Sequence, residues 1–150
     1  MSERRFGMYQ YQNFPVPQLR QRWQREEALG FDLLWNVDTV VAPDCAWSPM
    51  FDGPATLPAM ALSTTRIRVG NSLVTSLYFR HPVLAARPTV SIDHLSNGGV
   101  EVALGVGDPS AGPAALGVEE WPASERVERF REFVELTDRL LRSESTTARG

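Results

Sequence analysis

The chain has 150 residues, of which 43% are hydrophobic and 22% are charged, and its formal net charge is -3. This length can bury a core of its own, and the composition is typical of one soluble globular domain. It contains no apolar run near the roughly 20 residues of a membrane helix, and its N-terminus lacks the apolar region of a secretory signal. The acidic balance argues against a nucleic-acid surface. We therefore expect a cytoplasmic protein that binds neither membrane nor nucleic acid.

All 15 basic residues are arginines, which we attribute to codon bias in a GC-rich genome. A chain without lysine cannot carry a phosphate-loop lysine or a Schiff-base lysine. Cys45 is the single cysteine, so an internal disulfide is excluded and a reducing compartment is favoured. It has no adjacent histidine, and we expect no reactive thiol. Because no HExxH or CxxC spacing occurs, we expect no metal site.

Candidate strands and helices alternate along the chain. Stretches rich in β-branched and aromatic residues predict four strands, at 6–11, 31–37, 67–75 and 100–106. Helical spacing of apolar residues predicts four helices, at 18–29, 56–65, 82–96 and 124–141. This alternation predicts parallel strands with right-handed crossovers in a single α/β unit over residues 1–150.

Local signals indicate where the helices begin and end. Thr56 and Ser124 are predicted N-caps, and Pro82 suits the first turn of its helix. Pro88 lies inside that helix, where we expect a kink costing about 3 kcal/mol. The last helix is amphipathic, and the polar tail at 143–150 is expected to be flexible. The expected apolar stripe of the last helix comprises Val127, Phe130, Val134, Thr137 and Leu141.

Ligands of parallel α/β sheets bind beyond the carboxyl ends of the strands. Four such ends are available, at 11–13, 38–39, 71–76 and 105–108. Two of the connections that leave them, 38–53 and 107–122, are long, and loops longer than about 12 residues are often functional. The sequence thus favours a site at this edge of the sheet.

Asp38 is the sharpest candidate at that edge, because it directly follows the apolar strand FDLLWNV. Its carboxylate is expected to point into the pocket, although it could instead start a turn or accept a hydrogen bond from a neighbouring amide. His81 could act as a general acid or ligand, or could simply pack or cap the helix that starts at Pro82. His94 is expected to be only a favourable cation at a helix C-terminus.

Glycines and aromatic residues supply further candidates. Gly105 and Gly107 permit close approach of the backbone to a flat ligand or a phosphate, or reflect tight strand-to-loop geometry. Trp47 and Phe51 could wall a pocket or anchor their loop. We take Trp47 and Tyr11, which ends the first strand, as candidate substrate contacts.

Four segments together resemble the bacterial luciferase-like monooxygenase superfamily, in particular its flavin- and deazaflavin-dependent oxidoreductases. They are FDLLWNVD (31–38), TTRIRVG (64–70), RHPVLAARPTVSIDHLSNGGVEVALGVG (80–107) and SERVERFREFVELTDRLL (124–141). The resemblance implies a (β/α)₈ TIM barrel of roughly twice this length. This chain would form a half-barrel of about its first four βα units.

The resemblance also implies a cofactor and the residues that contact it. Members of the family carry FMN or the deazaflavin coenzyme F420, and catalyse hydride transfer or monooxygenation of organic substrates. Asp38 matches an acidic residue often found near the ring, and Ser72–Leu73 matches a non-proline cis peptide that faces it. The expected cofactor contacts are Asp38, Asn71, Ser72, Leu73, Gly105, Val106 and Gly107, and the expected catalytic residues are Asp38 and His81.

The sequence departs from the family pattern at two positions. Thr39 stands where a catalytic histidine is common, and Asp108-Pro109 stands where the fourth strand commonly leads into an aromatic residue. His81 is at most a substitute for the absent histidine.

The phosphate site of such barrels is usually formed after strands seven and eight, which this chain lacks. We therefore expect either one half of a flavin-dependent oxidoreductase site or a non-catalytic half-barrel that binds or assembles. The chain could be a truncated piece of a longer protein, could pair with a second copy as a homo-oligomer or with another half-barrel chain, or could be a reduced protein that has lost catalysis.

Overall fold

A computed structural model describes residues 4–39, 50–73, 76–107 and 112–143. Its centre is a parallel sheet with the strand order β1-β2-β3-β4. The strands are β1 (Gly7–Tyr9), β2 (Leu33–Val37), β3 (Arg68–Leu73) and β4 (Val100–Leu104). The predicted alternation and parallel pairing are confirmed, and each strand is shorter than the sequence pattern suggests.

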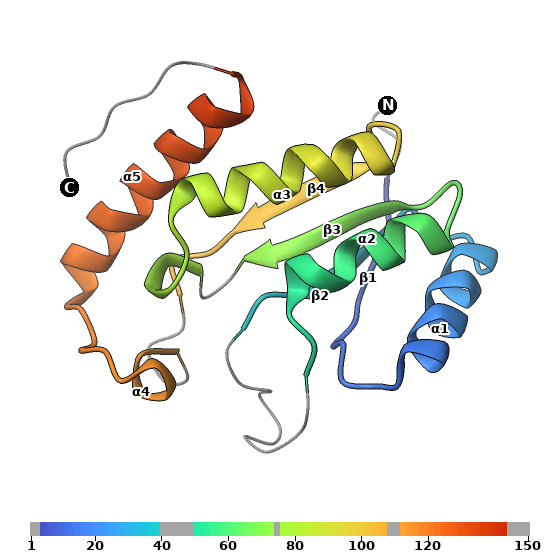
Figure 1. Ribbon diagram of the computed structural model, residues 1–150, viewed down its shortest axis with the longest axis horizontal. Coiled ribbons are helices and arrows are strands. Elements are labelled where there is room, and N and C mark those ends of the chain that lie inside the picture. The colour runs from blue at the N-terminus through green and yellow to red at the C-terminus, as the bar shows by residue number, and fades with distance from the viewer. Residues whose placement is uncertain (1–3, 40–49, 74–75, 108–111, 144–150) are drawn as a thin grey trace.

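The helices cover one face of this sheet, and α2 and α3 lie in front of it in Figure 1. The main helices are α1 (Val16–Ala28), α2 (Gly53–Ser63), α3 (Pro82–Leu95) and α5 (Ala123–Leu141). Each packs against the next one along the chain, α1 on α2, α2 on α3 and α3 on α5. Two short elements, η1 (Ser76–Tyr78) and α4 (Gly112–Leu116), lie in the connections that leave β3 and β4.

The main core lies between the sheet and helices α1 to α3. Leu34 of β2 and Val69 of β3 are buried at its centre, where they pack with Leu19, Trp23 and Met60. Because side chains alternate along a strand, Trp35 and Gly70 lie on the opposite face of the sheet. A Cβ atom on Gly70 would come within 2.4 Å of the Trp35 ring, so the present position of this indole requires glycine at residue 70.

A second, smaller cluster joins α5 to α3. Phe133 of α5 is buried against Ala85 of α3, with Leu77, Val102 and Leu104 packed around them. The predicted stripe on α5 is only partly correct. Thr137 is buried, whereas Val127 and Leu141 are exposed, because the buried face is centred on Phe133.

Two predicted helix N-caps are wrong. The N-cap of α2 is Asp52 rather than Thr56, because the Asp52 carboxylate accepts a hydrogen bond from the Ala55 N–H at 2.9 Å. Helix α5 begins at Ala123 with no side-chain cap, so Ser124 is not its N-cap. Helix α3 runs through Pro88 without a break, and the kink expected there stays a prediction.

Two other expectations concern the chain ends and the peptide backbone. No cis peptide bond occurs in the described residues, so the cis bond implied for Ser72–Leu73 is not found. The predicted flexible tail lies outside the described residues from position 144 onward. Within the described ranges, no helix is both long and apolar enough to cross a membrane.

Candidate functional site

The carboxyl ends of β2 and β3 gather buried polar side chains. Gln12, Asn36, Asp38 and Asn71 are each at most 5% exposed. Asp38 directly follows β2, and its backbone N–H donates to the Ser72 carbonyl at 2.9 Å. This bond fixes the first residue after β2 to the end of β3.

Arg80 binds Asp38 through two hydrogen bonds. Its Nε donates to Oδ2 at 2.5 Å and its Nη2 donates to Oδ1 at 2.9 Å, so both carboxylate oxygens are engaged. Arg80 Nη2 also donates to the Asp52 carboxylate. We call Arg80, Asp38 and Asp52 the Arg80 cluster. The hydrogen bonds to Asp38 are the main reason that the pKa of the Arg80 guanidinium is raised, although burial acts in the opposite direction.

Gln12 binds the end of β2 from the β1 side. Its side-chain amide donates to the Val37 carbonyl, and its Oε1 accepts from the Val37 N–H at 3.3 Å. The Gln12 carbonyl accepts from the Phe51 N–H at 3.0 Å. A single buried residue therefore contacts both the end of β2 and Phe51, near the end of the 38–53 connection.

Asn36 and Gly53 bring the start of α2 against the sheet. Asn36 Nδ2 donates to the Gly53 carbonyl at 2.8 Å. A Cβ atom on Gly53 would lie 2.7 Å from the Val37 carbonyl oxygen and 2.8 Å from Asn71 Oδ1. Asn71, an expected cofactor contact, thus lies buried on the helix-covered side of the sheet beside Gly53.

On the opposite face, Tyr9 and Ser72 form a polar pair at the same edge. The Tyr9 phenol is hydrogen-bonded to the Ser72 side chain, and burial raises the pKa of that phenol while the Ser72 bond lowers it. Tyr9 remains 44% exposed. Tyr11, an expected substrate contact, meets the Tyr9 ring edge-on with 5.7 Å between ring centroids.

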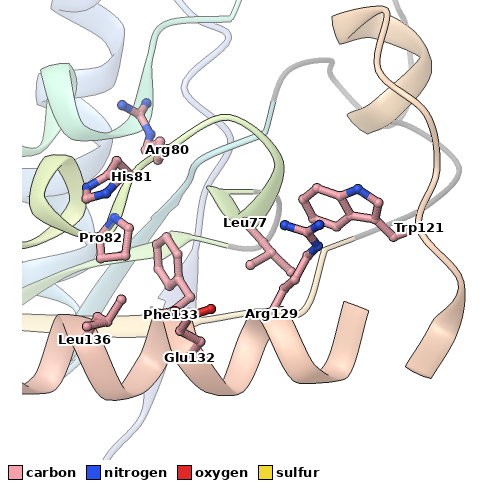
Figure 2. Close-up of a pocket in the computed structure, with 9 residues that line it drawn as sticks. All are labelled: Leu77, Arg80, His81, Pro82, Trp121, Arg129, Glu132, Phe133 and Leu136. Carbon is pink, nitrogen blue, oxygen red and sulfur yellow. The ribbon is translucent and has the colours of Figure 1, made fainter. Parts of the chain in front are cut away.

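His81 caps α3, as one of the two sequence interpretations expects. Its Nδ1 accepts a hydrogen bond from the Val83 N–H at 3.3 Å, and the side chain is exposed. It also lines a pocket of about 260 Å³ between the start of α3 and α5. Figure 2 shows Phe133 reaching from α5 toward Pro82, while the Arg80 guanidinium points away from α5. The pocket is lined by Leu77, Arg80, His81, Pro82, Trp121, Arg129, Glu132, Phe133 and Leu136.

The other predicted site residues are placed only in part. Gly105, Val106 and Gly107 follow β4 and are half-buried, and Gly107 has a φ of 90°, which favours glycine. Leu73 ends β3 next to Leu104 of β4. Trp47 lies outside the described residues.

Arg80, Asp52 and Tyr9 were not predicted as site residues. A signal for Arg80 exists, because a carboxylate buried at a strand end requires a partner charge. Arg80 is the only arginine between Arg68 and Arg87. In the described part of the chain, no group of three histidine, cysteine or acidic residues is arranged to hold a metal ion.

The luciferase-like monooxygenase family model matches residues 1–150. The chain is 31% identical over 133 residues to the F420-dependent glucose-6-phosphate dehydrogenase of Amycolatopsis mediterranei, a match that covers 84% of this chain and 38% of the relative. The chain thus spans less than half the length of the relatives it matches.

Solved structures show the same fold. An F420-dependent secondary alcohol dehydrogenase bound to an F420–acetone adduct superposes with a TM-score of 0.81 at 20% identity, over 97% of this chain and 44% of the other. The oxygenating component of 3,6-diketocamphane monooxygenase from Pseudomonas putida, bound to FMN, gives 0.77 at 15% identity, over 97% and 41%. The described sheet and helices therefore correspond to one part of a larger TIM-barrel fold.

Proposed function

Because the chain belongs to the luciferase-like monooxygenase family, we propose that it supplies the ring-facing half of a flavin-type cofactor site in an oxidoreductase. The cofactor is FMN or F420, and the substrate is a small organic molecule. The names of the relatives support this choice, since they include F420-dependent dehydrogenases and a monooxygenase bound to FMN.

One observation carries the proposal: Tyr9 and Ser72 form a half-exposed polar pair at the carboxyl edge of the sheet, on the face that no described helix covers. This is the edge at which parallel α/β folds bind ligands. The neighbouring strand end, Gly105 to Gly107, has two residues without side chains. A flat ring system fits such a surface, because it can approach backbone atoms on one side and a phenol on the other.

In this arrangement the chain's own residues bind and orient the ring. Ser72, Leu73 and Gly105–Gly107 end two paired strands, and we propose them as the main ring contacts. The bound cofactor would supply the redox chemistry, either by accepting or donating hydride or by reacting with oxygen. Tyr9 would hold its phenol proton near the ring, since its raised pKa keeps the group neutral at physiological pH.

Asp38 and His81 remain predictions as catalytic residues. Both carboxylate oxygens of Asp38 contact Arg80, and Nδ1 of His81 caps α3. Either group would need to leave its present partner, or to use its remaining atoms, in order to exchange a proton with a ligand. We therefore propose Asp38 as a residue that shapes the site, and His81 Nε2 as the atom that remains for acid–base chemistry.

The test is a titration of the purified chain with FMN and, separately, with F420, followed by cofactor fluorescence. We expect saturable quenching by one of them, weakened by Gly105→Val, which places a branched side chain at the proposed ring contact. Val127→Ala is the control, because Val127 is 59% exposed on α5 and is not among the proposed ring contacts. Absence of saturable binding of both cofactors at every protein concentration would exclude the proposed function for this chain.

A second candidate function is a non-catalytic half-barrel that assembles with its own copy or another chain. Two observations favour it: Thr39 stands where the family commonly has a histidine, and Trp35 lies on the face that no described helix covers. Light scattering together with the titration separates the candidates. A stable dimer that binds neither cofactor would favour assembly over catalysis.

A further inference from the structure

The turn between α3 and β4, residues 96–99, contains the only Asn-Gly pair of the sequence, Asn97-Gly98. Both residues are exposed, and their φ angles, 53° for Asn97 and 80° for Gly98, lie in the left-handed region that ends many helices. Because glycine has no side chain, nothing on Gly98 itself hinders the approach of its backbone nitrogen to the neighbouring Asn97 side chain. The pair therefore places an amide carbon next to an unhindered backbone nitrogen.

In the folded chain, hydrogen bonds hold both sides of the Gly98 residue. Its N–H donates to the Asp93 carbonyl at 2.8 Å, a bond that closes the end of α3. Its carbonyl accepts from Arg68 Nη1 at 3.2 Å, and Arg68 belongs to β3. A nitrogen that donates its proton to a carbonyl must first lose that bond before it can attack another group.

Ser96 and β3 hold the same turn from two further directions. The Ser96 hydroxyl donates to the Asp93 carbonyl at 3.2 Å and accepts from the Gly99 N–H at 3.1 Å. The Gly99 carbonyl accepts from the Val69 N–H of β3 at 2.9 Å. The turn is thus fixed to both the end of α3 and the start of β3, and the Gly98 nitrogen becomes free only when this arrangement opens.

We propose that Asn97 is a site of spontaneous deamidation, and that the hydrogen bonds of turn 96–99 set its rate in the folded chain. In the first step the Gly98 nitrogen forms a bond to Cγ of Asn97 and the Cγ–Nδ2 bond breaks. Ammonia leaves with the proton of the Gly98 N–H. Water then opens the resulting succinimide ring at one of its two carbonyl carbons, which gives aspartate or isoaspartate. This inference is independent of the proposed cofactor site.

Both products change the connection between α3 and β4. Aspartate adds a negative charge at the C-terminal end of α3, where the helix dipole disfavours an anion. Isoaspartate routes the backbone through Cγ and lengthens it by one atom, so the turn cannot keep its contacts to Asp93 and Arg68 together in the present geometry. The turn precedes β4 and lies at the amino edge of the sheet, so we expect modification to lower stability without touching the carboxyl edge.

Peptide mass spectrometry after incubation in mildly alkaline buffer, with and without urea, tests the proposal. In urea we expect Asn97 to convert faster than the other three asparagines, Asn13, Asn36 and Asn71, none of which precedes glycine. In the folded chain, conversion at Asn97 should be slower than in urea by about tenfold or more, because the turn must open first. Equal rates with and without urea would overturn the role of the turn, and no conversion at Asn97 in urea would overturn the site itself.

Ser96→Ala measures the contribution of the turn. It removes both hydroxyl contacts and leaves the Asn-Gly pair unchanged, so we expect the rate in the folded chain to rise by about threefold or more while the rate in urea stays the same. Ser91→Ala is the matched control, because Ser91 is exposed on α3 and its hydroxyl donates to the Arg87 carbonyl of the same helix at 3.1 Å. It should change neither rate.

Arg68→Met is a second variant, which decides the question if Ser96→Ala fails to fold. It removes the donors to the Gly98 and Val100 carbonyls while keeping an unbranched side chain, and it should also raise the rate in the folded chain. Unchanged rates at Asn97 in both variants would overturn the protective role of these contacts. The isoaspartate form of the wild type should melt lower than the unmodified chain by about 2 °C or more, and an equal melting temperature would overturn the expected effect on the α3–β4 connection.

Discussion

Two clusters of arginine and carboxylate side chains contact the sheet at different places, and they combine the two kinds of side chain in opposite numbers. In the Arg80 cluster one arginine serves two carboxylates, and the key carboxylate is buried. In the other, which we call the Glu101 cluster, Glu101 of β4 binds Arg5 at 2.6 Å and Arg68 at 2.7 Å.

The two clusters differ in exposure rather than in the number of contacts. The side chains of Arg5, Arg68 and Glu101 are 58%, 38% and 23% exposed, compared with 3% for Asp38. Water screens exposed pairs, which contribute little stability, whereas removing one partner of a buried pair leaves an uncompensated charge. We therefore expect the Arg80 cluster to determine the local structure, whereas the Glu101 cluster should change the stability only slightly.

The largest effect is expected from Arg80→Ala. It removes the arginine that binds both carboxylate oxygens of the buried Asp38, and we expect the free energy of unfolding to fall by about 3–5 kcal/mol in urea denaturation. Arg5→Ala in the Glu101 cluster should cost less than about 1 kcal/mol, because the Arg5 side chain is 58% exposed. Equal losses in the two variants would contradict the contrast between the clusters.

A smaller loss is expected from Gly53→Ala, which tests how closely α2 approaches the ends of β2 and β3. A methyl group there would overlap the Val37 carbonyl, a backbone atom that cannot rotate away. We expect a loss of about 1–3 kcal/mol, measured in the same way. Gly7→Ala is the control, since a Cβ atom at Gly7 has no neighbour closer than 3.3 Å.

Tyr9→Phe tests the polar pair that Tyr9 and Ser72 form on the face of the sheet that no described helix covers. Loss of the hydrogen bond to Ser72 should weaken cofactor affinity by about fivefold, which is ~1 kcal/mol. The raised pKa of Tyr9 means that wild-type affinity should not change between pH 7 and 9 through this group. A fall in wild-type affinity over that range that Tyr9→Phe abolishes would show that the phenol ionises and would contradict this assignment.

The smallest effect is expected from Glu101→Gln, below about 1 kcal/mol and further reduced by salt. Burial would raise the pKa of Glu101, but the hydrogen bonds from Arg5 and Arg68 outweigh it and lower that pKa. A lowered folded-state pKa gives stability that is present above the unfolded value of 4.5 and is lost as the pH falls through the folded value. The wild type should therefore lose its small advantage over Glu101→Gln on acidification below about pH 4.5. An advantage that persists at pH 3 would contradict the sign of this shift.

The sequence predicts the fold well because its signals are local. Apolar strands such as Leu33–Val37 and the regular alternation of elements suffice for the parallel sheet. Helix ends are harder to place. The N-cap of α2 is Asp52, which follows a long stretch of sequence without periodicity, and the short helix α4 lies in a stretch rich in glycine, proline and alanine. The exposure of Val127 depends on how α5 packs against α3, which no pattern within one helix reveals.

The sequence predicts a residue of the site only where that residue lies at or directly after the end of a strand. Asp38 was found because it directly follows β2. Its partner Arg80 is 42 residues away in sequence, and Arg80 is 28 residues from Asp52. Such pairings depend on which strands become neighbours, and a single sequence contains no local mark of them. Tyr9 was missed for the same reason, since its role comes from Ser72 two strands away.

The close packing of Gly53 against Val37 has a consequence for protein engineering. The two boundaries of the 39–51 segment are fixed by contacts that lie outside the segment itself, from Gln12, Arg80 and the sheet. Lengthening a closed loop costs little entropy, about 0.6 kcal/mol for each doubling. The end of β2 and the start of α2 are thus held by contacts that do not involve residues 40–49, and we expect both elements to keep their places when that stretch of sequence is exchanged.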